Sequence, residues 1–149
     1  MGEYITRAEI REAVPEDYPP IYSLIKHELG YADLDFGKLC VRLSKIKADD
    51  KQLTVVADVD GEVVGFMGIS RYTAYNYEGE YLQIVALAVH EQKQNQGVGS
   101  QLTKWAEEYA AENKMPAVVL TSRLHRTDAH AFYERKGYTK ASFGFRKDI

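Results

Sequence analysis

Apolar and polar positions change their spacing along the chain, and each change marks an expected element. In the first third, a short strand over residues 5–13 is followed by apolar side chains at helical intervals of three and four in 21–29 and again in 36–46. Gly30 stands where the first helix should end, and Asp35 stands where its side chain can cap the start of the second. This third therefore predicts one strand and two amphipathic helices.

The middle of the chain has the period of two that is typical of strands. Residues 53–59 and 62–71 alternate on either side of Asp60-Gly61, the dipeptide that a type I′ turn favours, which predicts a β-hairpin. Residues 81–89 are apolar almost throughout, as expected of a central strand that is covered on both faces.

The last third adds two helices and two strands. We expect an amphipathic helix over 98–110, a buried strand over 117–121 and a helix from 125 that ends at Gly137. Residues 138–145 should form a closing strand, because their phenylalanines alternate with other residues. The order β-α-α-β-β-β-α-β-α-β predicts an α/β fold whose central mixed sheet carries helices on both faces.

Length and charge narrow the class of protein. The 149 residues contain no repeat or linker and suit a single domain over 1–149. The net charge of −3 offers no basic field for nucleic acid, and no apolar run approaches the length of a membrane span. The single cysteine, Cys40, cannot form an internal disulfide, and no Cys/His cluster has the spacing of a metal site. These features favour a cytoplasmic protein without a metal.

A glycine-containing segment between the central strand and the following helix is the strongest chemical signal. Helix N-termini present unpaired N–H groups to anions, and Gly97 and Gly99 would let a phosphate approach the backbone closely. A plain strand-to-helix turn would have the same spacing. The nucleotide motifs fail, since Ser100 stands in place of the Walker lysine and Leu102 in place of the third dinucleotide glycine. Neither ATP nor NAD is indicated.

Three stretches, in order along the chain, resemble the GCN5-related N-acetyltransferase (GNAT) family. The run Gln-x-x-Gly-x-Gly at 94–99 is similar to the motif that follows the family's central strand. The run Ala-x-x-Phe-Tyr-x-x-x-Gly-Tyr at 129–138 is similar to its C-terminal element, and residues 10–21 match its usual opening. The resemblance implies the GNAT fold and an N-acetyltransferase that uses acetyl-CoA as co-substrate.

The resemblance also implies which residues bind the coenzyme. In the family the pyrophosphate sits on amides of the loop, and the pantetheine arm pairs with the central strand as an extra strand would. Arg126 stands where many members carry an asparagine that contacts CoA. The implied coenzyme-binding residues are Leu87, Ala88, Val89, Gln94, Asn95, Gln96, Gly97, Val98, Gly99, Ser100 and Arg126.

Catalysis in the family needs a general acid for the departing thiolate and a base for the amine. Tyr133 matches the family's acid, although a tyrosine on such a helix can also be core packing. One branch of the family places a glutamate on the central strand where this chain has Gln83, whose amide cannot accept a proton. Glu80 or Glu78, alone or through water, could serve as the base, and Glu80 is the one that we expect.

The acetyl acceptor should enter from the side opposite CoA. Carboxylates beside aromatic rings suit a cationic amine, of a small molecule or a peptide, and we expect such a wall from Tyr31, Asp33, Tyr77 and Glu78. The alternative is a sensor module of the same fold that binds acyl-CoA without turnover. A homodimer formed through the closing strand is left open.

Overall fold

The computed structural model describes residues 5–149, which divide into two compact units. The first extends to Val119 and the second covers Leu120–Ile149. None of the helices in residues 5–149 has both the length and the apolar run that a bilayer crossing requires. The single domain expected over 1–149 stays a prediction.

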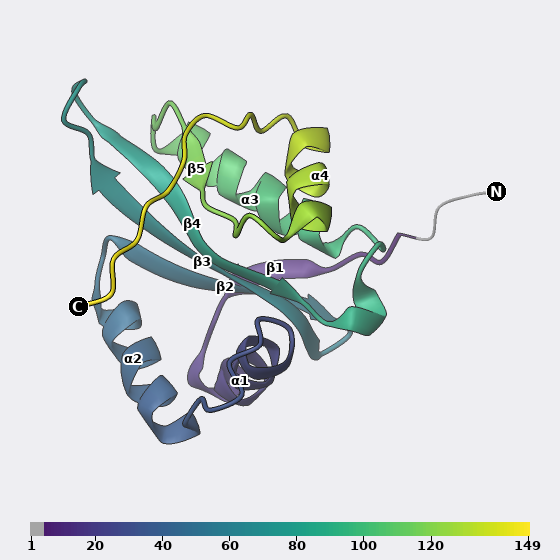
Figure 1. The fold of residues 1–149 in the computed structure, drawn as a ribbon. Coiled ribbons are helices and arrows are strands. Elements are labelled where there is room, and N and C mark those ends of the chain that lie inside the picture. The colour runs from purple at the N-terminus through teal and green to yellow at the C-terminus, as the bar shows by residue number, and fades with distance from the viewer. Residues whose placement is uncertain (1–4) are drawn as a thin grey trace. The chain divides into compact units, whose positions relative to one another are not determined.

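The first unit is built on a sheet with the strand order β1-β2-β3-β4-β5 (Figure 1). The strands are β1 (Glu9–Glu12), β2 (Gln52–Val59), β3 (Glu62–Thr73), β4 (Glu80–Val89) and β5 (Val118–Leu120). Neighbours from β1 to β4 pair antiparallel. A helix connects β4 to β5, and the N–H of Leu82 donates to the C=O of Ala117 at 3.1 Å just before β5 begins. The mixed sheet expected from the sequence is confirmed.

The turn between β2 and β3 has the geometry expected from its sequence. Asp60 and Gly61 have φ angles of 52° and 88°, and two positive values in succession define a type I′ turn. The carboxylate of Asp58 accepts the N–H of Gly61 at 2.7 Å, which closes the turn. The predicted hairpin is therefore confirmed.

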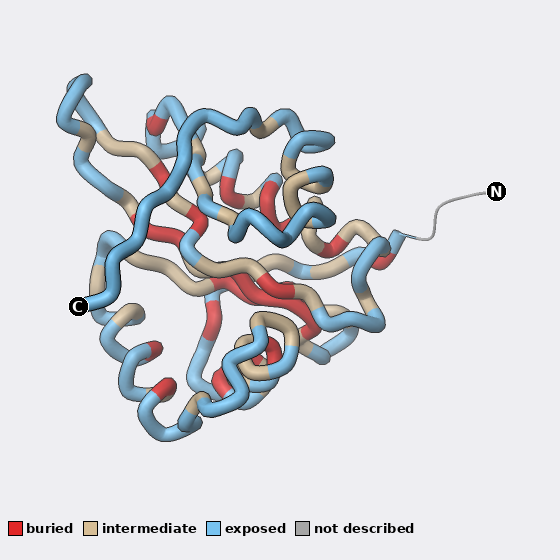
Figure 2. Tube along the Cα trace, in the orientation of Figure 1, coloured by how far each residue is buried: buried red, intermediate tan, exposed pale blue. Residues whose placement is uncertain are grey.

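Helices cover both faces of the sheet, as Figure 1 shows. On one face lie α1 (Tyr18–His27), preceded by the 3-10 turn η1 (Pro15–Asp17), and α2 (Phe36–Ala48); on the other lies α3 (Val98–Glu112), preceded by η2 (Glu91–Lys93). The predicted cap of α2 forms, because the carboxylate of Asp35 accepts the N–H of Lys38 at 2.8 Å. The α1–α2 face buries a cluster of apolar side chains between helices and strands: Ile21, Leu24, Leu39, Leu43, Val56, Phe66 and Ala88. Figure 2 colours the buried stretches of the backbone red.

Strand β4 changes the face of its apolar side chains at Val85. Gly68 pairs with Ala86 and Ile69 pairs with Ile84, so Val85 is an extra residue in β4, a β-bulge. After the bulge, Ala86 packs on the α1–α2 cluster. Before it, Ile84 shares the opposite face with Ile69, because directly paired residues project to the same side. One strand thus contributes to two apolar layers.

The second unit contains α4 (Thr127–Arg135), which ends as predicted at Gly137, with φ of 91°. The predicted closing strand over 138–145 is wrong, since no strand forms there. Phe143 and Phe145 are 80% and 97% exposed, so their alternation does not mark a buried face. A strand also needs a neighbouring backbone to satisfy its N–H and C=O groups, and alternation alone does not supply one.

Candidate functional site

The loop between β4 and α3 turns through two left-handed residues. Asn95 has φ of 63°, and Gly97, at the N-cap of α3, has φ of 85° and ψ of 2°. A side chain at such angles is strained, so glycine is the residue that this cap favours. Gly97 therefore has the conformational role that the sequence predicted for it.

The first turn of α3 presents backbone N–H groups that the helix itself cannot use. The first backbone hydrogen bond of the helix is the one that the N–H of Gln101 donates to the C=O of Gly97, at 3.1 Å. The N–H groups of Val98, Gly99 and Ser100 precede it and have no intrahelical acceptor. Gly97 carries no side chain to cap them. These amides, at the positive end of the helix dipole, form a cradle for an anion.

Glu28, just after α1, holds the first part of the loop that follows β4. Its carboxylate accepts the N–H of Glu91 at 3.2 Å and the side-chain amide of Gln94 at 3.4 Å. The same Gln94 amide donates to the C=O of Val89 at 3.0 Å, which ties the loop to the end of β4. Sequence reasoning missed Glu28, because it lies more than 60 positions before its partners and no local pattern connects them.

Strand β4 places the three residues expected to bind pantetheine directly before this loop. Leu87, Ala88 and Val89 pair on one edge with Met67, Phe66 and Gly65 of β3. Backbone groups of a strand alternate between its two edges, so only the edge of this stretch away from β3 could receive an extended ligand. The coenzyme-binding role of these residues stays a prediction.

Glu80, expected as the base, is held in a cluster of ion pairs. Its carboxylate lies 2.7 Å from Lys51 Nζ and 2.7 Å from a guanidinium nitrogen of Arg71. Hydrogen bonds from Lys51, and then from Arg71, lower the pKa of Glu80 below its ordinary value. Glu80 is therefore ionised at neutral pH but is a weak proton acceptor, so the structure gives its predicted role as base little support.

Tyr133, expected as the acid, lies on α4 in the second unit. Its ring makes edge contacts with Phe132 and Tyr138, with centroids 5.3 and 5.9 Å apart. Burial raises the pKa of Tyr133 above its ordinary value, and the positive charge of Arg126 opposes this shift. The phenol is therefore protonated at neutral pH, as a general acid must be. Because both residues belong to the second unit, their proximity to the loop stays a prediction.

The residues expected to form the acceptor wall come from two connections of the first unit. Tyr31 and Asp33 lie between α1 and α2, whereas Tyr77 and Glu78 lie between β3 and β4. Figure 1 shows the β3–β4 tip, at the upper left, projecting away from the α1–α2 connection. The structure therefore does not bring the two pairs together. All four side chains are exposed, and their role in binding substrate stays a prediction.

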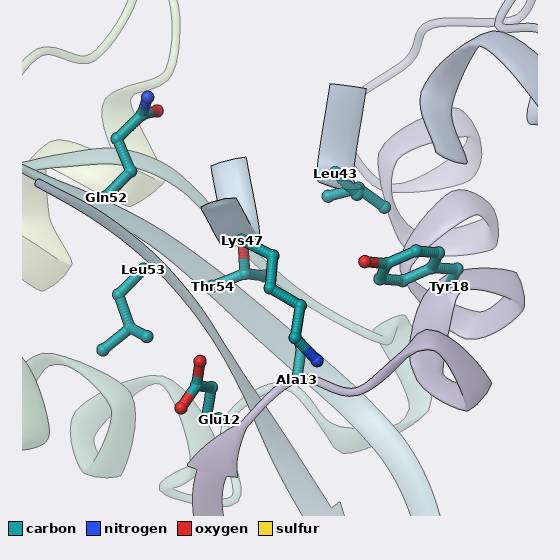
Figure 3. Close-up of a pocket in the computed structure, with 8 residues that line it drawn as sticks. All are labelled: Glu12, Ala13, Tyr18, Leu43, Lys47, Gln52, Leu53 and Thr54. Atoms are coloured by element: carbon teal, nitrogen blue, oxygen red, sulfur yellow. The ribbon is translucent and has the colours of Figure 1, made fainter. Parts of the chain in front are cut away.

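A small cavity lies at the end of β1, away from this loop (Figure 3). Its volume of about 10 Å³ admits one water molecule rather than a substrate. It is lined by Glu12, Ala13, Tyr18, Leu43, Lys47, Gln52, Leu53 and Thr54, none of which was expected in the site.

Comparison with known proteins gives the family of this fold and loop. The model of the acetyltransferase (GNAT) family matches residues 8–138. The aminoalkylphosphonate N-acetyltransferase of Salmonella typhimurium is 32% identical over 141 residues, which cover 95% of this chain and 91% of that protein.

Solved structures show the same fold. A crystal structure described as a transcriptional regulator from Bacillus halodurans has 29% identity and a TM-score of 0.86, covering 96% of this chain and 100% of that one. A GNAT family acetyltransferase of Staphylococcus aureus has 24% identity and a TM-score of 0.80, covering 97% and 100%. Because the family model matches most of this chain, the chain belongs to the acetyltransferase (GNAT) family.

Proposed function

We propose that this protein transfers the acetyl group of acetyl-CoA to the primary amine of a small molecule or peptide. The observation that carries the proposal is the cradle of N–H groups at Val98, Gly99 and Ser100, which follows the left-handed cap at Gly97. A pyrophosphate has the charge and the acceptor oxygens that such a cradle favours. Membership in the GNAT family supports acetyl-CoA as the donor.

Residues of the loop and of β4 would divide the work of holding the coenzyme. The amides from Gln96 to Ser100 would bind the pyrophosphate, and the free edge of Leu87–Val89 would pair with the pantetheine arm. An N–H group on that edge could also stabilise the negative charge that develops on the thioester oxygen during attack. Gln94 would support the loop and not bind the anion directly, since its N–H donates to the C=O of Glu91 at 3.4 Å and its side-chain amide donates to Val89 and Glu28.

The acid and the base follow from the states of the ionisable groups. Tyr133, protonated at neutral pH, would donate its proton to the departing thiolate. The attacking amine must first lose a proton, and Glu80 is a weak acceptor while Lys51 and Arg71 hold it. A water molecule that relays the proton to solvent therefore suits this site better than direct transfer to Glu80.

The acceptor is proposed from a relative and from the chemistry of the exposed loops. The Salmonella relative is named for aminoalkylphosphonates, small molecules with a primary amine. Carboxylates at Asp33 and Glu78, which are close in sequence to Tyr31 and Tyr77, could attract the cationic form of such an amine. Aminoalkylphosphonates are therefore the first acceptors to assay.

The test separates binding from turnover. Acetyl-CoA at about 100 times its Kd should stabilise the protein by about 2.7 kcal/mol in a thermal melt. An amine panel that includes aminoalkylphosphonates, polyamines and peptide N-termini is then screened for acetyl-CoA-dependent release of thiol. Stabilisation without thiol release from any amine would favour the acyl-CoA sensor, and no stabilisation would refute the proposed function.

A further inference from the structure

The segment before β1 is bound to the loop between β4 and α3 through the side chain of Gln101. The amide nitrogen of Gln101 donates to the C=O of Thr6 at 2.7 Å and to the C=O of Gly97 at 3.0 Å. Its amide oxygen accepts the N–H of Ala8 at 3.0 Å. A neighbouring parallel strand would use the same two groups, one on each side of Arg7, so this side chain replaces one residue of such a strand.

Thr6 makes the second half of the connection. Its N–H donates to the C=O of Gln96 at 2.9 Å, and its hydroxyl donates to the side-chain oxygen of Gln96. Thr6 is 7% exposed, so these bonds are shielded from competing water. Thr6, Gln96 and Gln101 together form what we term the N-terminal clamp.

The clamp fixes the direction of two peptide groups in the loop. In a trans peptide the C=O and the N–H point in opposite directions. Thr6 holds the C=O of Gln96, which turns the N–H of Gly97 away from the N-terminal segment. Gln101 holds the C=O of Gly97, which turns the N–H of Val98 outward from the helix. These two N–H groups belong to the proposed pyrophosphate cradle.

We propose that Thr6 and Gln101 are positioning residues for coenzyme binding: they contact no substrate, but they hold the cradle amides in the binding orientation before the anion arrives. The proposal rests on the proposed function, because it assigns the clamp to the same loop. Without the clamp, the loop would have to become ordered as it binds, and that cost would weaken its affinity for CoA.

The experiment compares shape-conserving variants by calorimetric titration with CoA and by steady-state kinetics. Thr6→Val removes the hydroxyl, Gln101→Met removes the amide, and Thr6→Ser restores the hydroxyl. Gln52→Met is the matched control. It also removes a side-chain amide, at the start of β2, and with it the hydrogen bond of 2.8 Å that this amide donates to Asp49. Each protein is also melted without ligand, to measure any loss of stability.

Thr6→Val and Gln101→Met should raise the Kd for CoA and the KM for acetyl-CoA about fivefold to tenfold, as expected from one or two lost hydrogen bonds. Their kcat should stay within about twofold, Thr6→Ser should restore most of the affinity, and Gln52→Met should bind CoA like the wild type. Variants that melt at lower temperature but bind CoA with wild-type affinity would show a purely structural clamp and overturn the proposal. Wild-type protein that binds no CoA would instead refute the proposed function.

Discussion

Replacing Gly97 by alanine tests the conformation on which the anion cradle depends. Alanine in the left-handed region costs about 1–2 kcal/mol. Its new Cβ would lie 3.4 Å from Ile5 Cγ2 and 3.8 Å from Gln101 Nε2, which is ordinary contact and adds no steric cost. Alanine also lowers the entropy of the unfolded chain, which returns about 0.4–1 kcal/mol. The net loss should be about 1 kcal/mol, or a fall in Tm of about 2–4 °C.

Coenzyme binding should suffer more than stability does. If the loop relaxes toward negative φ, the N–H of residue 97 turns away from the anion, and one hydrogen bond to a charged group is worth about 1.5–3 kcal/mol. The affinity of Gly97→Ala for CoA should therefore fall at least about tenfold. Urea denaturation measures the first effect and calorimetric titration measures the second.

Gly37→Ala is the matched control. Gly37 lies in the first turn of α2 with an ordinary backbone conformation, and a Cβ there would lie 3.4 Å from the carboxylate of Asp35. This variant should be as stable as the wild type or more stable by up to about 1 kcal/mol, with CoA affinity unchanged. A Gly97→Ala protein with the stability and the CoA affinity of the wild type would refute the assigned role of the left-handed cap.

Three further predictions concern ionisable groups. Tyr133→Phe should lower kcat at least about 100-fold with little loss of stability, and unchanged turnover of the purified variant would remove its role as acid. Glu80→Gln should leave the acidic limb of the pH–rate profile in place if water relays the proton; its disappearance would restore Glu80 as the base. Asp17→Asn should destabilise the protein by about 1–3 kcal/mol in urea, because Asp17 is 5% exposed and accepts two hydrogen bonds from Arg11, at 2.7 and 3.0 Å. These hydrogen bonds from Arg11 lower the pKa of Asp17. Its contribution to the free energy of unfolding is therefore full above the ordinary aspartate pKa, near pH 4, and is lost as the pH falls through the lowered value. Equal acid sensitivity of variant and wild type would contradict this account.

Local signals predicted most of the elements, because the residues that define them are close in sequence. The turn at Asp60-Gly61 and the cap at Asp35 each need only a few neighbouring residues, and both form as expected. Gly97 was identified in the same way, from the helix that begins directly after it. The closing strand over 138–145 was wrong, because alternation describes one strand and cannot say whether a partner is present.

The hydrogen bonds and ion pairs that hold the site residues could not be predicted, because they join segments that are far apart in sequence. Thr6 and Gln101 are 95 positions apart, and neither belongs to a recognisable motif. The ion pairs of Glu80 join it to Lys51, which is 29 positions earlier, and they change a candidate base into a weak proton acceptor. Only the folded structure shows which partners these polar side chains find.

The β-bulge of β4 lets that strand hold one residue more than its partner strand while both apolar layers keep their side chains. Val85 is 51% exposed, so Val85→Ala should remove little buried surface and have little effect. Deleting the same residue would make Ile84 and Ala86 neighbours, which face opposite sides in a regular strand, so Ile84 would still pair with Ile69 and Ala86 with Gly68. The deletion would therefore remove the bulge, with the local bend and added twist that it gives β4, and would leave Ala86 and Ala88 in the layer under α1 and α2.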